Sequence, residues 1–142
     1  MIALFVAALI LVLDRLTKAW AIAHLAVGTP VPFVGSLVEW NLIRNHGAAF
    51  GMLSGQSVLF VAVAIAAVFG LLYALRRRPK IWIQIGIGGI LGGALGNLWD
   101  RLLGHGVVDF IDVRLWSYIF NVADIGITLG AIVLIVALWH ES

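Results

Sequence analysis

The sequence predicts an all-α membrane protein with four transmembrane helices and a small extramembrane β-sheet. Two compositional observations carry this prediction: 63% of the 142 residues are hydrophobic, and only 11% are charged. Average soluble domains carry roughly 25% charged residues, and so short a chain cannot hide this much apolar surface in one water-soluble core. The third observation is that the apolar runs are long and lack the period-two alternation of barrel strands, which indicates helices as the spanning elements.

Four windows are long enough to cross a bilayer, which takes about 20 mostly apolar residues in a helix. They cover about 2–24, 57–75, 81–103 and 121–139. The chain 1–142 is therefore predicted to form a single membrane-embedded domain. The first window is expected to be a retained helix, because no basic residue precedes its apolar run and three further windows follow it.

Basic residues set the predicted orientation of the helices. Four of the nine Lys and Arg residues lie in the short link between the second and third windows: Arg76, Arg77, Arg78 and Lys80. The positive-inside rule places this link in the cytoplasm. With four spans both termini are then cytoplasmic, and the segments 25–56 and 104–120 lie on the outer side of the membrane.

The first outer segment, 25–56, has the periodicity of a β-strand. Val38, Trp40 and Leu42 alternate with Glu39 and Asn41, which is typical of a half-buried strand. The segment is therefore predicted to contribute short strands to a small sheet that lies on the outer surface of the membrane.

Polar residues inside the spans mark the functional region, because an ionisable group in hydrocarbon is costly and usually faces the bundle interior. Asp14 and Lys18 lie four residues apart on one face of the first span. They are either an ion pair that supports the bundle or groups that act in the chemistry. At the outer end of the third span, Asn97, Asp100 and Arg101 lie on one arc of the helix. A ridge of small residues, which predicts close helix packing, leads to them: Gly88, Gly92 and Gly96, with Gly89 and Gly93 beside them.

Two aspartates near the outer boundary are candidate catalytic groups. Asp109 lies in the apolar run 107–112 and Asp124 opens the fourth span, so a short connection can fold back and bring them together. Two carboxyl groups in one apolar pocket do not both ionise easily, so one keeps its proton while the other stays charged. The charged group can take a proton from water, and the protonated one can donate to a carbonyl oxygen. This is aspartic-protease chemistry, without metal or covalent intermediate, although spacing alone also leaves Asp100 and Asp112 as candidates.

Other catalytic chemistries have less support in the sequence. The chain has no cysteine, which excludes thiol catalysis and thiolate metal sites. His105 and Asp109 lie four residues apart, but no third metal ligand is evident. A Ser–Lys dyad built on Lys18 has no supporting motif.

Five sequence blocks together carry a family resemblance. They occur in the order Asp14-Arg-Leu-Thr-Lys18, Asn45-His-Gly-Ala-Ala-Phe-Gly51, Gly92-Gly-Ala-Leu-Gly-Asn97-Leu-Trp-Asp100-Arg101, Val107-Val-Asp109-Phe-Ile-Asp112 and Phe120-Asn121-Val-Ala-Asp124. The set resembles the bacterial lipoprotein signal peptidases, also called signal peptidase II, over nearly the whole chain. Each block by itself is weak, but all five in this order with four spans are highly specific.

The resemblance implies an aspartyl endopeptidase of the bacterial cytoplasmic (inner) membrane, acting toward the outer, periplasmic side. Its substrates would be prolipoproteins, cut just before a cysteine that carries diacylglycerol, and its catalytic pair would be Asp109 and Asp124, with no metal or cofactor. Which aspartate is the base and which the acid stays open. The supporting polar residues would be Asp14, Lys18, Asn45, Asn97, Arg101 and Asn121, with Asp100 as the expected partner of Arg101. The expected partners are the lipid-modified substrate and membrane lipids, with no nucleic acid, and nothing in the sequence calls for more than a monomer.

The rival interpretation is a small proton-coupled transporter or channel. Intramembrane Asp14, Lys18 and Arg101 would also suit a proton relay. A relay needs polar groups in the cytoplasmic half of the membrane, however, and the second, third and fourth spans are nearly bare there.

Overall fold

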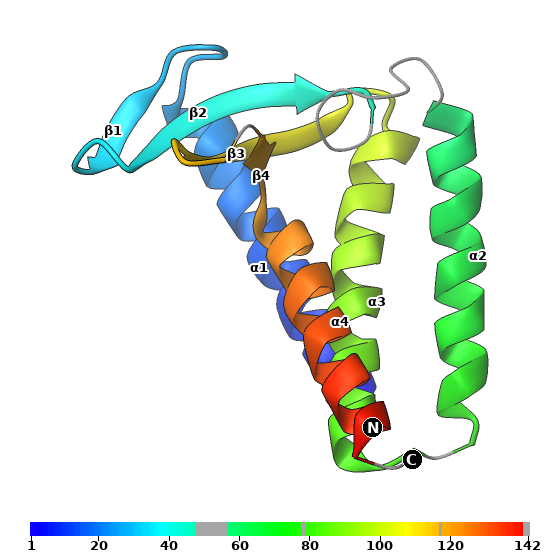
Figure 1. The fold of residues 1–142 in the computed structure, drawn as a ribbon. Helices are drawn as coiled ribbons and strands as arrows, with labels where there is room; N and C mark the ends of the chain where they lie inside the picture. The colour runs from blue at the N-terminus through cyan, green and yellow to red at the C-terminus, as the bar shows by residue number, and fades with distance from the viewer. Residues whose placement is uncertain (48–56, 78, 117, 141–142) are drawn as a thin grey trace.

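The computed structural model describes residues 1–47, 57–77, 79–116 and 118–140. Its helices are α1 (Ile2–His24), α2 (Ser57–Leu75), α3 (Ile81–Leu102) and α4 (Val122–Trp139). They run side by side, with a β-sheet across one end and both ends of the chain near the other (Figure 1). These bounds agree with the four predicted windows to within one residue at each end.

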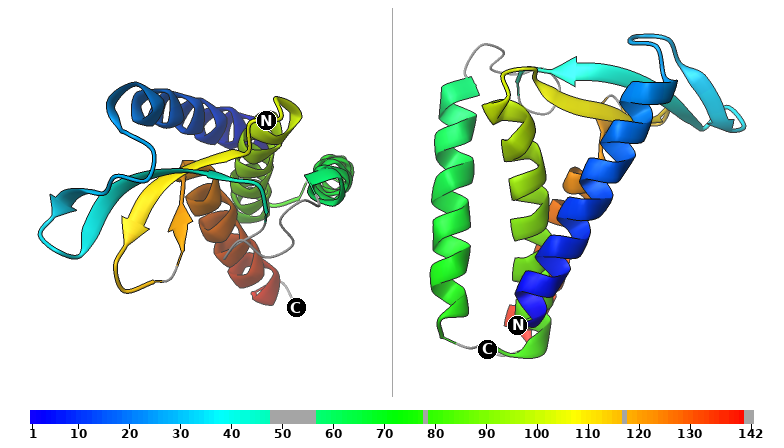
Figure 2. Two further views of the ribbon diagram at one scale, coloured as in Figure 1. Left: turned by 90° about the horizontal axis from the view of Figure 1, so that it is seen from above. Right: turned by 180° about the vertical axis from the view of Figure 1, so that it is seen from behind.

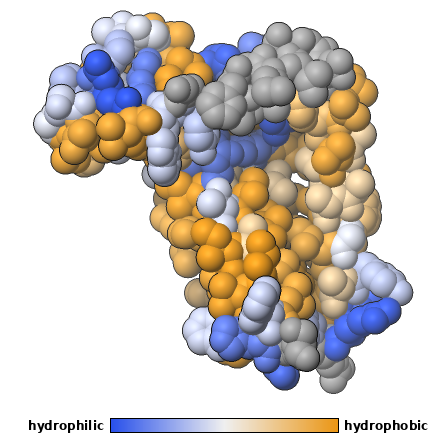
Figure 3. Space-filling view, in the orientation of Figure 1, coloured by the Kyte–Doolittle hydropathy of each residue, from blue (hydrophilic) through white to orange (hydrophobic). Residues whose placement is uncertain are grey.

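The helices carry a broad apolar surface around their middle. Within the described residues, α2, α3 and α4 are long and apolar enough to cross a membrane. The space-filling view shows hydrophobic side chains along the helices, with hydrophilic ones beneath the sheet and at the opposite end (Figure 3). α1 is as long as the others but contains Asp14, Arg15 and Lys18, so its crossing of the membrane stays a prediction.

Small residues make α3 the central helix, with α1 and α4 as its main neighbours. A Cβ atom built on Gly92 would lie 2.5 Å from the carbonyl oxygen of Ala7 in α1, and one built on Gly89 would lie 2.9 Å from that of Gly126 in α4. The predicted glycine ridge is therefore two adjoining faces, one for each neighbour. In a bilayer, apolar side chains gain little free energy by moving from lipid to a helix interface, because both are apolar. The close approach of the backbones is therefore what permits tight packing. α2 stands farther out and contacts mainly α3 (Figure 2).

The sheet is antiparallel, in the order β1-β2-β3-β4. Its strands are β1 (Val31–Val34), β2 (Val38–Asn45), β3 (Val107–Val113) and β4 (Ile119–Phe120). The expected strands of 25–56 are present, but the sequence analysis assigned none to 107–120, where β3 and β4 lie. β3 pairs with β2 along its length, which places Asp109 on a strand of the sheet. Seen from above, the sheet projects sideways beyond the helices (Figure 2).

The alternating pattern of β2 does not decide which of its side chains are buried. The register between β2 and β3 shifts between Trp40 and Ile43, and such a bulge re-aims the side chains on either side of it. Leu42 is buried in a small core beneath the sheet. Glu39, on the polar side of the alternation, is also buried, at 8% exposure, and accepts a 2.9 Å hydrogen bond from Arg114.

Candidate active site

A polar cavity of about 200 Å³ lies where α3 and α4 meet the sheet. Five of the predicted site residues line it, and they come from four different elements. Asn45 lies on β2, Asp109 on β3, Asn97 and Arg101 on α3, and Asp124 on α4. The fold thus brings both candidate aspartates to one cavity at the sheet end of the helices.

Asp109 is buried, and amide groups bind both of its carboxyl oxygens. Oδ1 accepts a 2.6 Å hydrogen bond from Nδ2 of Asn121, and Oδ2 accepts a 3.0 Å bond from Nδ2 of Asn45. Burial, followed by the charge of Asp124, raises the pKa of Asp109 to about 7, although the amide donors and Lys18 act in the opposite direction. Near neutral pH this carboxyl group is therefore divided between its protonated and ionised forms.

Asp124 is held in place by the beginning of α4. Asn121 is the N-cap of this helix, and its Oδ1 accepts a 3.0 Å hydrogen bond from the backbone N–H of Asp124. In return, Oδ2 of Asp124 accepts a 3.1 Å bond from the backbone N–H of Asn121, which completes a capping box. The other oxygen, Oδ1, accepts a 2.8 Å bond from Nδ2 of Asn97. A carboxylate at a helix N-terminus is also favoured by the helix dipole.

Asn121 connects the two aspartates. This residue is fully buried; its side chain donates to Asp109, and its backbone N–H donates to Asp124. Nδ2 also lies 3.1 Å from Oδ1 of Asn97 and 3.2 Å from the carbonyl oxygen of Val108. With two hydrogens and three acceptors in reach, this nitrogen has no free orientation, so the network holds both carboxyl groups at the cavity.

A buried ion cluster lies behind the cavity. Nζ of Lys18 is 3.0 Å from Oδ2 of Asp14 and 2.8 Å from Oδ2 of Asp100, and all three side chains are at most 5% exposed. The same Nζ donates a 3.0 Å hydrogen bond to Oδ1 of Asn97. Because Lys18 has only donors, it fixes which end of the Asn97 amide faces it, and the NH₂ end is left to donate to Asp124.

The expected pairing of Asp100 with Arg101 is wrong. Oδ1 of Asp100 accepts a 2.7 Å hydrogen bond from Arg15, and Oδ2 is paired with Lys18. Consecutive residues of a helix point about 100° apart, so Asp100 and Arg101 face different neighbours. Arg101 lines the cavity of Asp109 instead, and its guanidinium carbon lies 5.4 Å from the ring centroid of Phe60 in α2.

Arg15 is the polar residue that the sequence analysis missed. It also donates to Oδ2 of Asp14, at 2.8 Å, so it joins the acids of α1 and α3. The available signal was an arginine inside an apolar run, which usually has a partner in the bundle. The cavity of the two aspartates also has described lining residues that the sequence analysis did not assign to a site: Gly47, Val107, Tyr118, Ile119, Ile127 and Thr128.

Other predicted residues lie outside this cavity. Asp112 accepts a 3.1 Å hydrogen bond from Asn41 and is not part of the described lining. Asp14, Lys18 and Asp100 stand behind the cavity, not in its wall. Residues 48–51 of the second sequence block lie outside the described residues.

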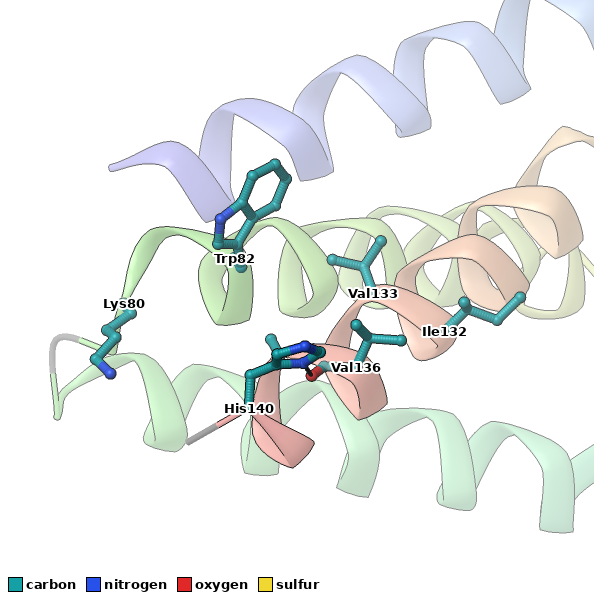
Figure 4. A pocket seen from close by; sticks show the side chains of 7 residues that line it. Lys80, Trp82, Ile132, Val133, Val136 and His140 are labelled. Atoms are coloured by element: carbon teal, nitrogen blue, oxygen red, sulfur yellow. Dashed lines mark hydrogen bonds between the residues drawn. The ribbon is translucent and has the colours of Figure 1, made fainter. Parts of the chain in front are cut away.

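A larger cavity, of about 600 Å³, lies at the opposite end of the bundle (Figure 4). Its described lining is mostly apolar and contains no carboxyl group: Lys80, Trp82, Ile132, Val133, Val136, Ala137 and His140. The candidate catalytic carboxyl groups therefore lie in the smaller cavity beneath the sheet.

Comparison with solved structures defines the class of protein. One structure, described as a bacterial membrane enzyme, superposes with a TM-score of 0.91 at 31% identity and covers 98% of this chain and 88% of its own. A second with the same description has a TM-score of 0.88 at 32% identity and covers 99% of this chain and 94% of its own. The fold is that of a membrane enzyme.

Sequence comparison identifies the family. Residues 6–140 match the family model described as signal peptidase (SPase) II. The lipoprotein signal peptidase of Mycobacterium avium is 46% identical over 140 residues, which cover 94% of this chain and 76% of that protein. That of Rhodococcus jostii is 44% identical over 138 residues, covering 92% and 69%. The chain belongs to the signal peptidase II family, and it is a membrane peptidase.

Proposed function

We propose that this protein is an aspartic-type endopeptidase that removes the signal peptide from diacylglyceryl-modified prolipoproteins. The observation that carries the proposal is the convergence of Asp109 and Asp124 on one cavity, where Asn121 bonds both of them. The substrate class is supported by relatives that are named lipoprotein signal peptidases. This family membership disfavours the transporter interpretation.

In the proposed mechanism the two aspartates share one water and have different roles. Asp109, whose pKa is raised to about 7, holds the proton, and Asp124, at the positive end of the α4 dipole, is the carboxylate. Asp124 takes a proton from the water while its oxygen attacks the scissile carbonyl carbon, and Asp109 gives its proton to the carbonyl oxygen. Asp124 then passes its proton to the leaving amide nitrogen, and Asp109 recovers a proton from the diol as the C–N bond breaks.

The surrounding polar groups position this pair. Asn45 and Asn97 each donate to one aspartate, and Arg101 lines the same cavity, where its charge offsets the single negative charge that the aspartate pair carries through the reaction. The cluster of Asp14, Lys18 and Asp100 holds Asn97 in its donating orientation.

The proposed topology has four spans, including α1, with both termini in the cytoplasm and the sheet on the outer side. Three apolar helices and the packing of α1 along α3 support it. The end of α2 and the beginning of α3, which flank the basic link, lie at the end opposite the sheet (Figure 1). The cavity then lies at the outer boundary, where a lipid-anchored cysteine can reach it from the bilayer. No second copy of the chain is needed to complete the cavity, so a monomer is the proposed unit.

The test is cleavage of a synthetic diacylglyceryl-modified precursor by the purified protein, with the unmodified peptide as control. Only the modified precursor should be cut, and Asp109→Asn and Asp124→Asn should each lower the rate by at least about 100-fold, as expected for the loss of a general acid or base. Asp112→Asn is the matched control, since Asp112 lies on the same strand but outside the cavity. Unchanged cleavage by either cavity variant would refute the catalytic assignment.

A further inference from the structure

A second polar cavity, of about 230 Å³, opens on the other face of the sheet. Arg44 of β2 and Val108 of β3 are directly paired, and both line it. The neighbouring pair, Asn45 and Val107, lines the cavity of the two aspartates. Successive residues of a strand point to opposite faces, so the two cavities are separated by the sheet. We name this second space the Arg44 cavity.

The Arg44 cavity carries an excess of positive charge. Its charged and titratable lining consists of Arg15, Lys18, Arg44, Asp100 and His105. Arg15 and Lys18 are balanced by Asp14 and Asp100. Arg44 and His105 are exposed, and in the described part of the chain neither side chain has a hydrogen bond or ion pair. An anion that enters the cavity would therefore meet an unpaired guanidinium group.

The lower wall of the cavity is apolar. Ala19 and Ile22 of α1 and Leu103, which follows α3, line it, and all three are exposed. Trp20 and Trp99, on the same ends of these helices, are 39% and 56% exposed, and exposed tryptophans favour the level of the lipid headgroups. The cavity thus combines cations at the sheet with an apolar wall toward the bilayer.

We propose that the Arg44 cavity binds the phosphate group of an anionic phospholipid from the surrounding membrane. The guanidinium of Arg44 matches phosphate oxygens in geometry as well as in charge, and His105 adds a second donor. The acyl chains then lie along Ala19, Ile22 and Leu103. In this position the lipid lies beside the sheet without entering the cavity of the two aspartates.

The experiment measures lipid retention by the full chain with native mass spectrometry. The protein, in neutral detergent, is incubated with equal amounts of phosphatidylglycerol and phosphatidylcholine of the same acyl composition. Phosphatidylglycerol should be retained preferentially, and Arg44→Gln should reduce that retention about tenfold, the loss expected for one charge-assisted contact. Arg44→Lys should retain an intermediate amount, because it keeps the charge but not the planar fork.

Matched controls separate this site from general attraction to the membrane. Arg114→Gln removes the same charge from the outer part of the sheet, outside the Arg44 cavity, and should not change retention. Glycerol phosphate tests the headgroup alone, and it should fail to displace the lipid at equal concentration. Unselective retention, equal loss in the Arg114 and Arg44 variants, or displacement by glycerol phosphate at equal concentration would each overturn the proposal. Asp109→Asn should lose cleavage but keep the lipid, so the two proposals can fail independently.

Discussion

Replacing Asp109 with Asn should change how the stability of this protein depends on pH. The pKa of Asp109 is raised from 3.8 to about 7 in the folded protein. A carboxyl group whose pKa is raised on folding binds its proton more tightly in the folded state, so stability falls as the pH rises from 3.8 to about 7 and is level above that range. Over this pH range the free energy of unfolding falls by ~4 kcal/mol. The side chain of Asp109 is only 2% exposed, so solvent screens this effect little.

The measurable quantity is the difference in free energy of unfolding between Asp109→Asn and the unchanged protein. Between pH 5 and pH 8 this difference should shift by about 2–3 kcal/mol in favour of the variant, because Asn does not titrate. In thermal unfolding followed by tryptophan fluorescence, that corresponds to a relative shift in Tm of about 8 °C for a chain of 142 residues. A lost or strained hydrogen bond to Asn45 or Asn121 would lower the stability of the variant equally at all pH values, so the slope separates the titration of the aspartate pair from such a loss.

Asp112→Asn is the control for this measurement. It removes a carboxyl group from the same strand, at a position bonded to Asn41 and outside the cavity, and its curve should run parallel to that of the unchanged protein. If Asp109→Asn also runs parallel from pH 5 to pH 8, the burial and coupling argument for Asp109 is incorrect. Because Asp109 and Asp124 interact, the pH-dependent change in stability reports the titration of the pair and not of one residue.

Three further experiments test the ion cluster, the packing of the helices and the cation–π contact. Lys18→Met removes one of the two cations shared by the buried carboxylates of Asp14 and Asp100, while Arg15 remains; it should destabilise the protein by about 3 kcal/mol, measured as a lower Tm. Gly92→Ala should prevent close packing of α1 and α3 and reduce the yield of folded protein, whereas Gly70→Ala, where a Cβ meets nothing within 4 Å, should be neutral or slightly stabilising in the same assay. Phe60→Leu removes the cation–π contact with Arg101 and should slow cleavage about fivefold, whereas Phe60→Trp should keep the rate; equal rates for both would show that the contact has no role.

Local sequence was sufficient for the helices. Each of the four windows lies within one residue of the observed bounds, because long apolar runs and the polar residues that end them act over one helix at a time. The small-residue spacing also predicted close packing around α3, since the consequence of a missing Cβ depends little on the identity of the neighbour. The sequence blocks alone were enough to indicate the family; the catalytic role of Asp109 and Asp124, which the resemblance singles out from four candidate aspartates, stays a prediction.

The tertiary structure decided which groups meet. β3 pairs with β2 across more than sixty residues, and the bulge between Trp40 and Ile43 arises only from that pairing. Asp100 bonds Arg15 instead of its neighbour in sequence, and Lys18 orients the Asn97 amide toward Asp124. The sequence by itself thus determined the four helices and the polar groups available near their ends at the sheet. Hydrogen bonds act over about 3 Å, so the partners of these buried groups were set only when distant segments packed against one another.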